Sequence, residues 1–68
     1  MIYGRGDEID VVIDRDGLAG DAGIGHLDDE TMVVITGAAG RVGESVHATV
    51  VALDTTRLGT SLLARAQS

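Results

Sequence analysis

Apolar residues recur at every second position near the start of the chain. Ile9, Val11 and Ile13 follow this spacing, with Asp10 and Asp14 at alternate positions. Successive side chains of a β-strand point to opposite faces of the sheet, so the pattern predicts a strand with one buried and one exposed face.

Four further short apolar segments follow, separated by glycine-rich or acidic turns. They predict strands over residues 22–27, 31–36, 45–53 and 60–66. Five short strands at roughly ten-residue spacing, without a long helical pattern, predict an all-β fold. We expect a small five-stranded antiparallel OB-like barrel, with room for one short helical turn after the third strand, in residues 37–43.

Residues 31–43 also allow a second interpretation. A hydrophobic strand leads into Thr-Gly-x-x-Gly-x-x-Gly, a spacing that resembles a dinucleotide-binding loop at the start of a helix. Residues 50–54 even resemble a second strand ending in a ribose-binding acid. However, residues 44–53 are rich in β-branched side chains, which favour a pleated sheet over a helix. The sequence therefore favours the barrel over a nucleotide-binding enzyme.

Length and composition indicate one domain spanning residues 1–68, with its core in 6–66. The chain has no cysteine and two histidines, so we expect no disulfide, no metal centre and no cofactor. Tyr3 is the only aromatic residue, which predicts an aliphatic core and marginal stability. With neither an apolar membrane span nor a signal segment, a soluble cytoplasmic protein with no membrane partner is expected.

The charge balance is unusual for a protein that binds nucleic acid. Five arginines, no lysine and eleven acidic residues give a formal net charge of −6. Nucleic-acid-binding modules are usually basic. The excess of acidic residues suits a halophilic host, whereas the preference for arginine over lysine is also typical of a high-GC genome.

The order of motifs resembles a known family. Residues 6–13 (Gly-Asp-Glu-Ile-Asp-Val-Val-Ile), the glycine-rich 20–25 and residues 27–34 are similar to the first half of a TRAM domain. The likeness resumes in residues 42–50 and ends in 62–65. It is closest to the TRAM module at the C-terminus of PIN-domain proteins and to stand-alone archaeal TRAM proteins. The resemblance implies an OB-like barrel that binds RNA without catalysis.

Two positions depart from the family pattern. Thr60 stands where relatives often have a basic residue, and Leu63 stands where they often have an aromatic one. An aromatic side chain that stacks on a base contributes about 1–3 kcal/mol. These two departures from the family pattern therefore predict weak RNA binding.

Candidate RNA contacts come from the cationic residues. In an OB-like barrel, loops and strand ends surround the face of strands 2 and 3, and an arginine fork there can hold a phosphate or stack on a base. The predicted RNA-binding residues are Arg15, His26, Arg41, Arg57 and Arg65. The competing interpretation makes these arginines solubilising partners of the many aspartates and leaves His26 a plain surface residue. His47 is also expected at the surface, and neither histidine has a partner at a spacing that suggests catalysis.

Two functions follow. The first is a low-specificity RNA-binding module for single-stranded or structured RNA, serving as an RNA chaperone or RNA-delivery domain and free-standing if Met1 is the native start. The alternative is an accessory oligomerisation or docking domain of a larger nuclease or RNA-modifying protein, beside a PIN or methyltransferase domain. Exposed Val12, Val51 and Leu53 would form the contact in that case.

Overall fold

The computed structural model describes residues 3–17, 20–27, 31–57 and 59–67. The five strands are β1 (Glu8–Asp16), β2 (Gly23–His26), β3 (Met32–Thr36), β4 (Ser45–Thr56) and β5 (Gly59–Ala66). No helix occurs in this described part of the chain. The all-β prediction is confirmed.

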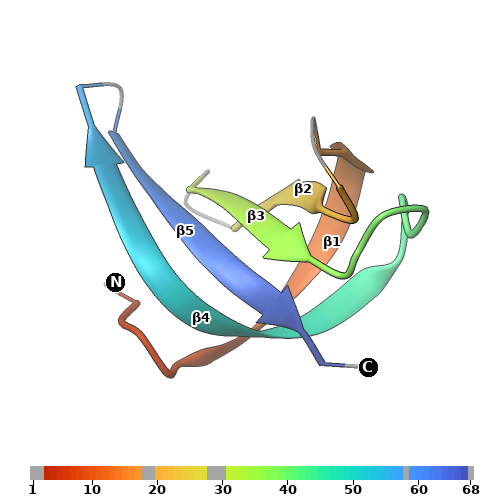
Figure 1. Ribbon diagram of the computed structural model, residues 1–68, viewed down its shortest axis with the longest axis horizontal. Helices are drawn as coiled ribbons and strands as arrows, with labels where there is room; N and C mark the ends of the chain where they lie inside the picture. Colours follow the sequence, from red (N-terminus) through yellow and green to blue (C-terminus); the bar gives the residue numbers. More distant parts are fainter. Residues whose placement is uncertain (1–2, 18–19, 28–30, 58, 68) are drawn as a thin grey trace.

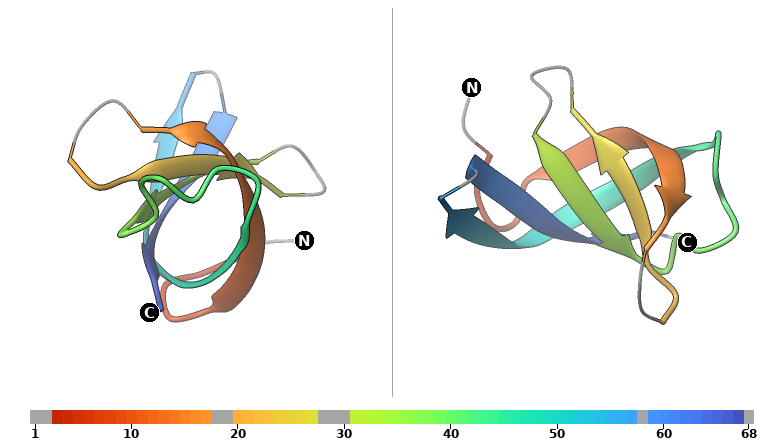
Figure 2. Two further views of the ribbon diagram at one scale, coloured as in Figure 1. Left: turned by 90° about the vertical axis from the view of Figure 1, so that its right-hand side faces the viewer. Right: turned by 90° about the horizontal axis from the view of Figure 1, so that it is seen from above.

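The strands close into a barrel in the order β1-β2-β3-β5-β4, with β4 returning to β1 (Figures 1 and 2). Four of the pairings are antiparallel, as predicted, but β3 and β5 run parallel. The prediction of an entirely antiparallel barrel was therefore wrong for this one pairing. A closed ring with an odd number of strands cannot alternate direction throughout, so at least one neighbouring pair must be parallel.

The barrel interior is filled by aliphatic side chains. The predicted face of β1 is buried, and Val33 and Ile35 of β3 lie opposite it with no exposed surface. The buried core residues are Ile9, Val11, Ile13, Val33, Ile35, Ala38, Val46, Ala48, Val50, Leu62 and Ala64. Tyr3 packs only against the edge of this cluster, so the prediction of an aliphatic core is confirmed.

The fourth strand serves two neighbours in succession. Its first half pairs with β1 and its later part pairs with β5, and a register shift between Val50 and Ala52 lies where it bends. Beyond that bend, β4 and β5 continue as a hairpin that projects past the barrel (Figure 1). The predicted strands 45–53 and 60–66 leave residues 54–59 for a turn. The observed turn is shorter because Thr55, a good strand former, pairs with Thr60.

The loop between β3 and β4 is built from consecutive turns. The Arg41 N–H donates to the Ala38 carbonyl at 3.3 Å, and the Glu44 N–H donates to the Arg41 carbonyl at 2.9 Å. Positive φ values at Gly37, Gly40 and Gly43 interrupt helical geometry, so the optional helical turn does not form. Because residues 45–53 lie in β4, the dinucleotide interpretation, which needs a helix there, is wrong.

Candidate nucleic-acid interface

A row of outward-facing side chains crosses four strands of the barrel. Backbone pairing sets Arg15 of β1 opposite Ile24 of β2, Ile24 opposite Val34 of β3, and Val34 opposite Leu63 of β5. Directly paired residues share one face of a sheet, and the neighbours of this row on β2, β3 and β5 are buried. The row therefore lies on the outer surface of the barrel.

Two parallel rows border this one. Met32 of β3 pairs with His26 on one side and with Ser61 on the other. In the other row, Arg65 lies between Thr36 of β3 and Thr49 of β4. Four apolar side chains thus lie together and are only partly covered. We call Ile24, Met32, Val34 and Leu63 the apolar strip.

The structure separates the five predicted contact residues into two groups. Arg15, His26 and Arg65 lie on or beside the apolar strip. Arg41 lies in the β3–β4 loop and Arg57 in the β4–β5 turn, and these segments are at opposite ends of the barrel (Figure 1).

The arginines also differ in their partners. Arg15, Arg57 and Arg65 form no ion pair with another residue in the part of the chain that the structure describes. The Arg41 Nε lies 3.4 Å from Glu44 Oε1, an exposed pair on the same loop. Arg15 and Arg65 therefore combine an unpaired guanidinium with a position beside apolar surface.

His26 is held by an acidic neighbour. Its Nδ1 lies 2.5 Å from Asp14 Oδ2, and both side chains are exposed. A base stacking on this ring would meet an imidazole already oriented by a carboxylate. The ring remains on the surface of β2, at the end of the row that contains Met32.

His47 bridges two carboxylates on the outer surface of β4 and β1. Its Nε2 donates to Glu8 Oε1 and its Nδ1 donates to Asp10 Oδ1, each at 2.7 Å. Ionised carboxylates only accept, so both bonds form only when both ring nitrogens carry hydrogen. The bond to Glu8, followed by the bond to Asp10, raises the His47 pKa above its ordinary value of 6.5. His47 is on the surface, as expected.

This raised pKa predicts a pH dependence of stability. The pKa is higher in the folded protein, so the stabilisation is complete below pH 6.5 and is lost as pH rises through the folded-state pKa. We expect a small decrease in Tm over that interval in thermal melts. His47→Gln should flatten the profile, and an unchanged profile in this variant would contradict the assignment.

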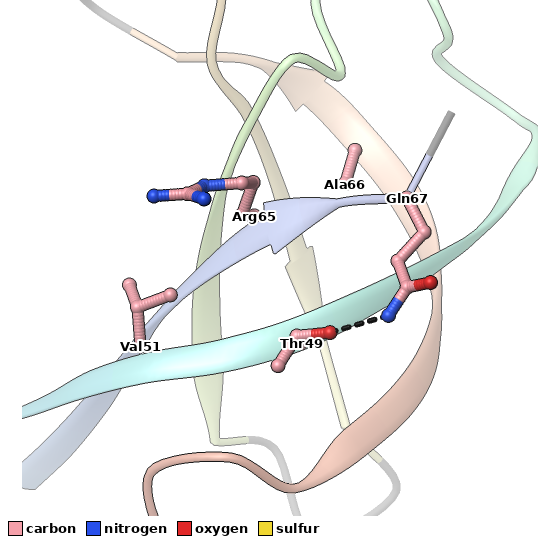
Figure 3. A pocket seen from close by; sticks show the side chains of 5 residues that line it. All are labelled: Thr49, Val51, Arg65, Ala66 and Gln67. Carbon is pink, nitrogen blue, oxygen red and sulfur yellow. Dashed lines mark hydrogen bonds between the residues drawn. The ribbon is translucent and has the colours of Figure 1, made fainter.

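A shallow pocket of about 450 Å³ lies beyond the strip, between the end of β5 and β4 (Figure 3). It is lined by Thr49, Val51, Arg65, Ala66 and Gln67. Gln67 Nε2 donates to Thr49 Oγ1 at 2.5 Å. Thr49 and Gln67 have no sequence signal that marks them as a site, because they are far apart along the chain and meet only when β4 pairs with β5.

The three apolar residues suggested for docking are exposed, but they do not form one surface. Val12 pairs with Ser45 at the beginning of β4. Val51 lies six residues further along, about 20 Å of extended strand, and Leu53 is on the projecting hairpin. A single interface built from all three is therefore not supported.

The described ranges contain neither a metal-binding cluster nor a membrane-spanning helix. No cluster of three or more histidine, cysteine or acidic side chains that could hold a metal ion is found there. Those residues also contain no helix long and apolar enough to cross a membrane.

The strand order and the partly apolar outer surface of β2 and β3 define a small barrel of the OB-like class. The TRAM domain family model matches residues 4–63, so the chain belongs to the TRAM domain family. TRAM domains are non-catalytic modules that generally bind RNA. Among curated proteins and among solved structures, no match to this chain is found.

Proposed function

We propose that this protein is a low-specificity RNA-binding module that acts as an RNA chaperone or delivers RNA to a partner enzyme. The observation that carries the proposal is the apolar strip with Arg15 and Arg65 beside it, on a barrel of the TRAM family. The stand-alone archaeal and PIN-linked forms are the proposed subtypes, and the cytoplasm is the proposed location.

The proposed mechanism divides the contacts by chemistry. The guanidinium groups of Arg15 and Arg65 hold backbone phosphates, and these contacts position RNA without identifying its bases. Unpaired bases lie against the apolar strip. Because this strip has no aromatic side chain, it lacks the strongest form of base stacking. RNA therefore binds and leaves readily, which suits a protein that loosens RNA structure.

The local charge of the interface matters more than the net charge. At physiological salt the Debye length is about 8 Å, so acids beyond that distance are largely screened. Glu8 and Asp10 project from β1 and engage His47. Asp14, next to Arg15 in β1, engages His26. Paired acids repel a phosphate less than free ones, which favours binding in spite of the net charge of −6.

A titration with labelled single-stranded RNA at several salt concentrations tests this function. Each phosphate contact with a single strand contributes about −0.7 to the log–log salt slope, so two or three contacts give a slope no steeper than about −2. We expect weak binding, with roughly micromolar or poorer affinity, and similar values for unrelated sequences. A steep slope or a strong preference for one sequence would contradict this mode of binding.

A docking function is the second candidate. The observation in its favour is the projecting β4–β5 hairpin (Figure 1). Leu53 lies on this hairpin, and 43% of its surface is exposed. In this case the partner is a PIN or methyltransferase domain, or a second copy of the chain. Sedimentation analysis tests self-association, and Leu53→Ser should abolish any dimer that uses the hairpin.

A further inference from the structure

The pocket at the end of β5 contains two groups that can donate hydrogen bonds to a ligand, Arg65 and Thr49, and a third, Gln67, that orients one of them. Arg65 contributes a guanidinium that no described carboxylate neutralises. Thr49 contributes a hydroxyl, and Gln67 contributes an amide whose two N–H groups face Thr49 and Glu8. In Figure 3 the three side chains come from two paired strands and the residue that follows them. Figure 3 shows the Arg65 guanidinium on one side of these residues and the Thr49–Gln67 pair on the other. A cation and a neutral hydroxyl donor that face one pocket can together recognise a phosphate group.

The hydrogen bond inside the pocket prepares the Thr49 hydroxyl for this role. Gln67 Nε2 donates to Thr49 Oγ1, so the hydroxyl oxygen is already an acceptor. Its own hydrogen stays available to a ligand, because a hydroxyl can accept and donate at the same time. Figure 3 shows this bond as a dashed line between the two side chains.

An acid that contacts the pocket residues is partly neutralised. Glu8 pairs with Thr49 across the β1–β4 ladder, and its carboxylate also accepts a long bond of 3.5 Å from Gln67 Nε2. The same oxygen accepts from His47 Nε2 at 2.7 Å. Because Glu8 is engaged by the imidazole, it opposes an anion in the pocket less than a free carboxylate would.

We propose that the pocket formed by Thr49, Arg65 and Gln67 is a subsite for one backbone phosphate of bound RNA. This inference rests on the proposed RNA-binding function and extends it beyond β2 and β3. Arg65 lies between Thr36 and Thr49, so the subsite continues the surface of the apolar strip onto β4. RNA whose bases lie on the strip would place a phosphate in this pocket.

The salt dependence of RNA binding distinguishes a phosphate contact from a general loss of affinity. Arg65→Gln should weaken binding about tenfold at low salt and make the log–log slope shallower by about 0.7. Thr49→Val keeps the strand-favouring shape and should weaken binding about threefold with no change in slope. Arg65→Lys should retain the slope, because it retains the charge.

Matched controls use positions outside the pocket. Arg5→Gln makes the same charge change in the exposed turn before β1, and Thr55→Val makes the same hydroxyl deletion further along β4. Both should leave the slope and the affinity nearly unchanged. If RNA binds but Arg65→Gln and Arg5→Gln have equal slopes, the subsite is wrong while the RNA-binding function stands.

Inorganic phosphate tests the pocket independently of RNA. In an NMR titration, phosphate should shift the Arg65 Nε–H and Gln67 side-chain amide signals, and the Thr49→Val variant should reduce both shifts. If the native protein binds no RNA but shows these shifts, the proposed function fails and the pocket remains an anion site. If phosphate leaves the Arg65 and Gln67 signals unmoved, the subsite is overturned.

Discussion

Replacing Gly25 with alanine should strongly destabilise the folded protein. A Cβ at this position would lie 2.5 Å from the Val12 carbonyl oxygen and closer still to Val11 Cγ1. Real Cβ atoms essentially never approach other atoms so closely, and the backbone of the neighbouring strand must move to relieve the contact. Overpacking costs about 1–3 kcal/mol and occasionally more. A domain of this size is stable by only about 3–10 kcal/mol.

The effect is measured by thermal or urea denaturation followed by circular dichroism. A loss of about 3 kcal/mol should lower Tm by roughly 12–24 °C. Gly4→Ala is the matched control, because its Cβ would meet nothing nearer than Asp7 Oδ2 at 4.0 Å. A Gly25→Ala protein as stable as Gly4→Ala would show that β1 and β2 do not approach each other as described.

Reversing the charge at Arg15 should nearly abolish RNA binding while leaving the fold intact. Arg15 is exposed and lies opposite Ile24, at the edge of the apolar strip. Arg15→Glu removes a phosphate contact and places a negative charge where the RNA backbone would pass. A hydrogen bond to a charged group contributes about 1.5–3 kcal/mol, and repulsion adds to its loss, so affinity should fall by roughly two orders of magnitude.

Arg41→Glu makes the same charge change in the β3–β4 loop, where Arg41 already pairs with Glu44. Its effect on RNA affinity should be much smaller, no more than about fivefold at low salt. Fluorescence anisotropy with one labelled RNA compares the two variants directly. Equal losses of RNA affinity in Arg15→Glu and Arg41→Glu would mean that the position of an arginine beside the apolar strip does not affect binding.

The sequence predicted the fold well because the strands have strong local signals. The spacing of Ile9, Val11 and Ile13 defined the buried face of β1, and the β-branched residues after Glu44 favoured a strand over a helix. The parallel pairing of β3 with β5 has no local signal. It results from closure of the barrel, which no single segment specifies.

The candidate site was harder to predict than the fold. Residue type alone selected five cationic residues, but the strand register determines that Arg15 and Arg65 lie beside the apolar strip while Arg41 and Arg57 do not. The His47 cluster joins β4 to acids at the beginning of β1. The Thr49–Gln67 contact likewise requires two paired segments. Such contacts depend on register, which periodicity does not determine.

The central claim is that RNA binds on the apolar strip and the arginines beside it. The most direct measurement is amide and methyl chemical-shift mapping of the native protein during titration with a short single-stranded RNA at low salt. We predict saturable shifts at Ile24, Met32, Val34 and Leu63, with smaller shifts in the β3–β4 loop. Absence of shifts at these four residues, or shifts confined to the projecting hairpin, would contradict the claim.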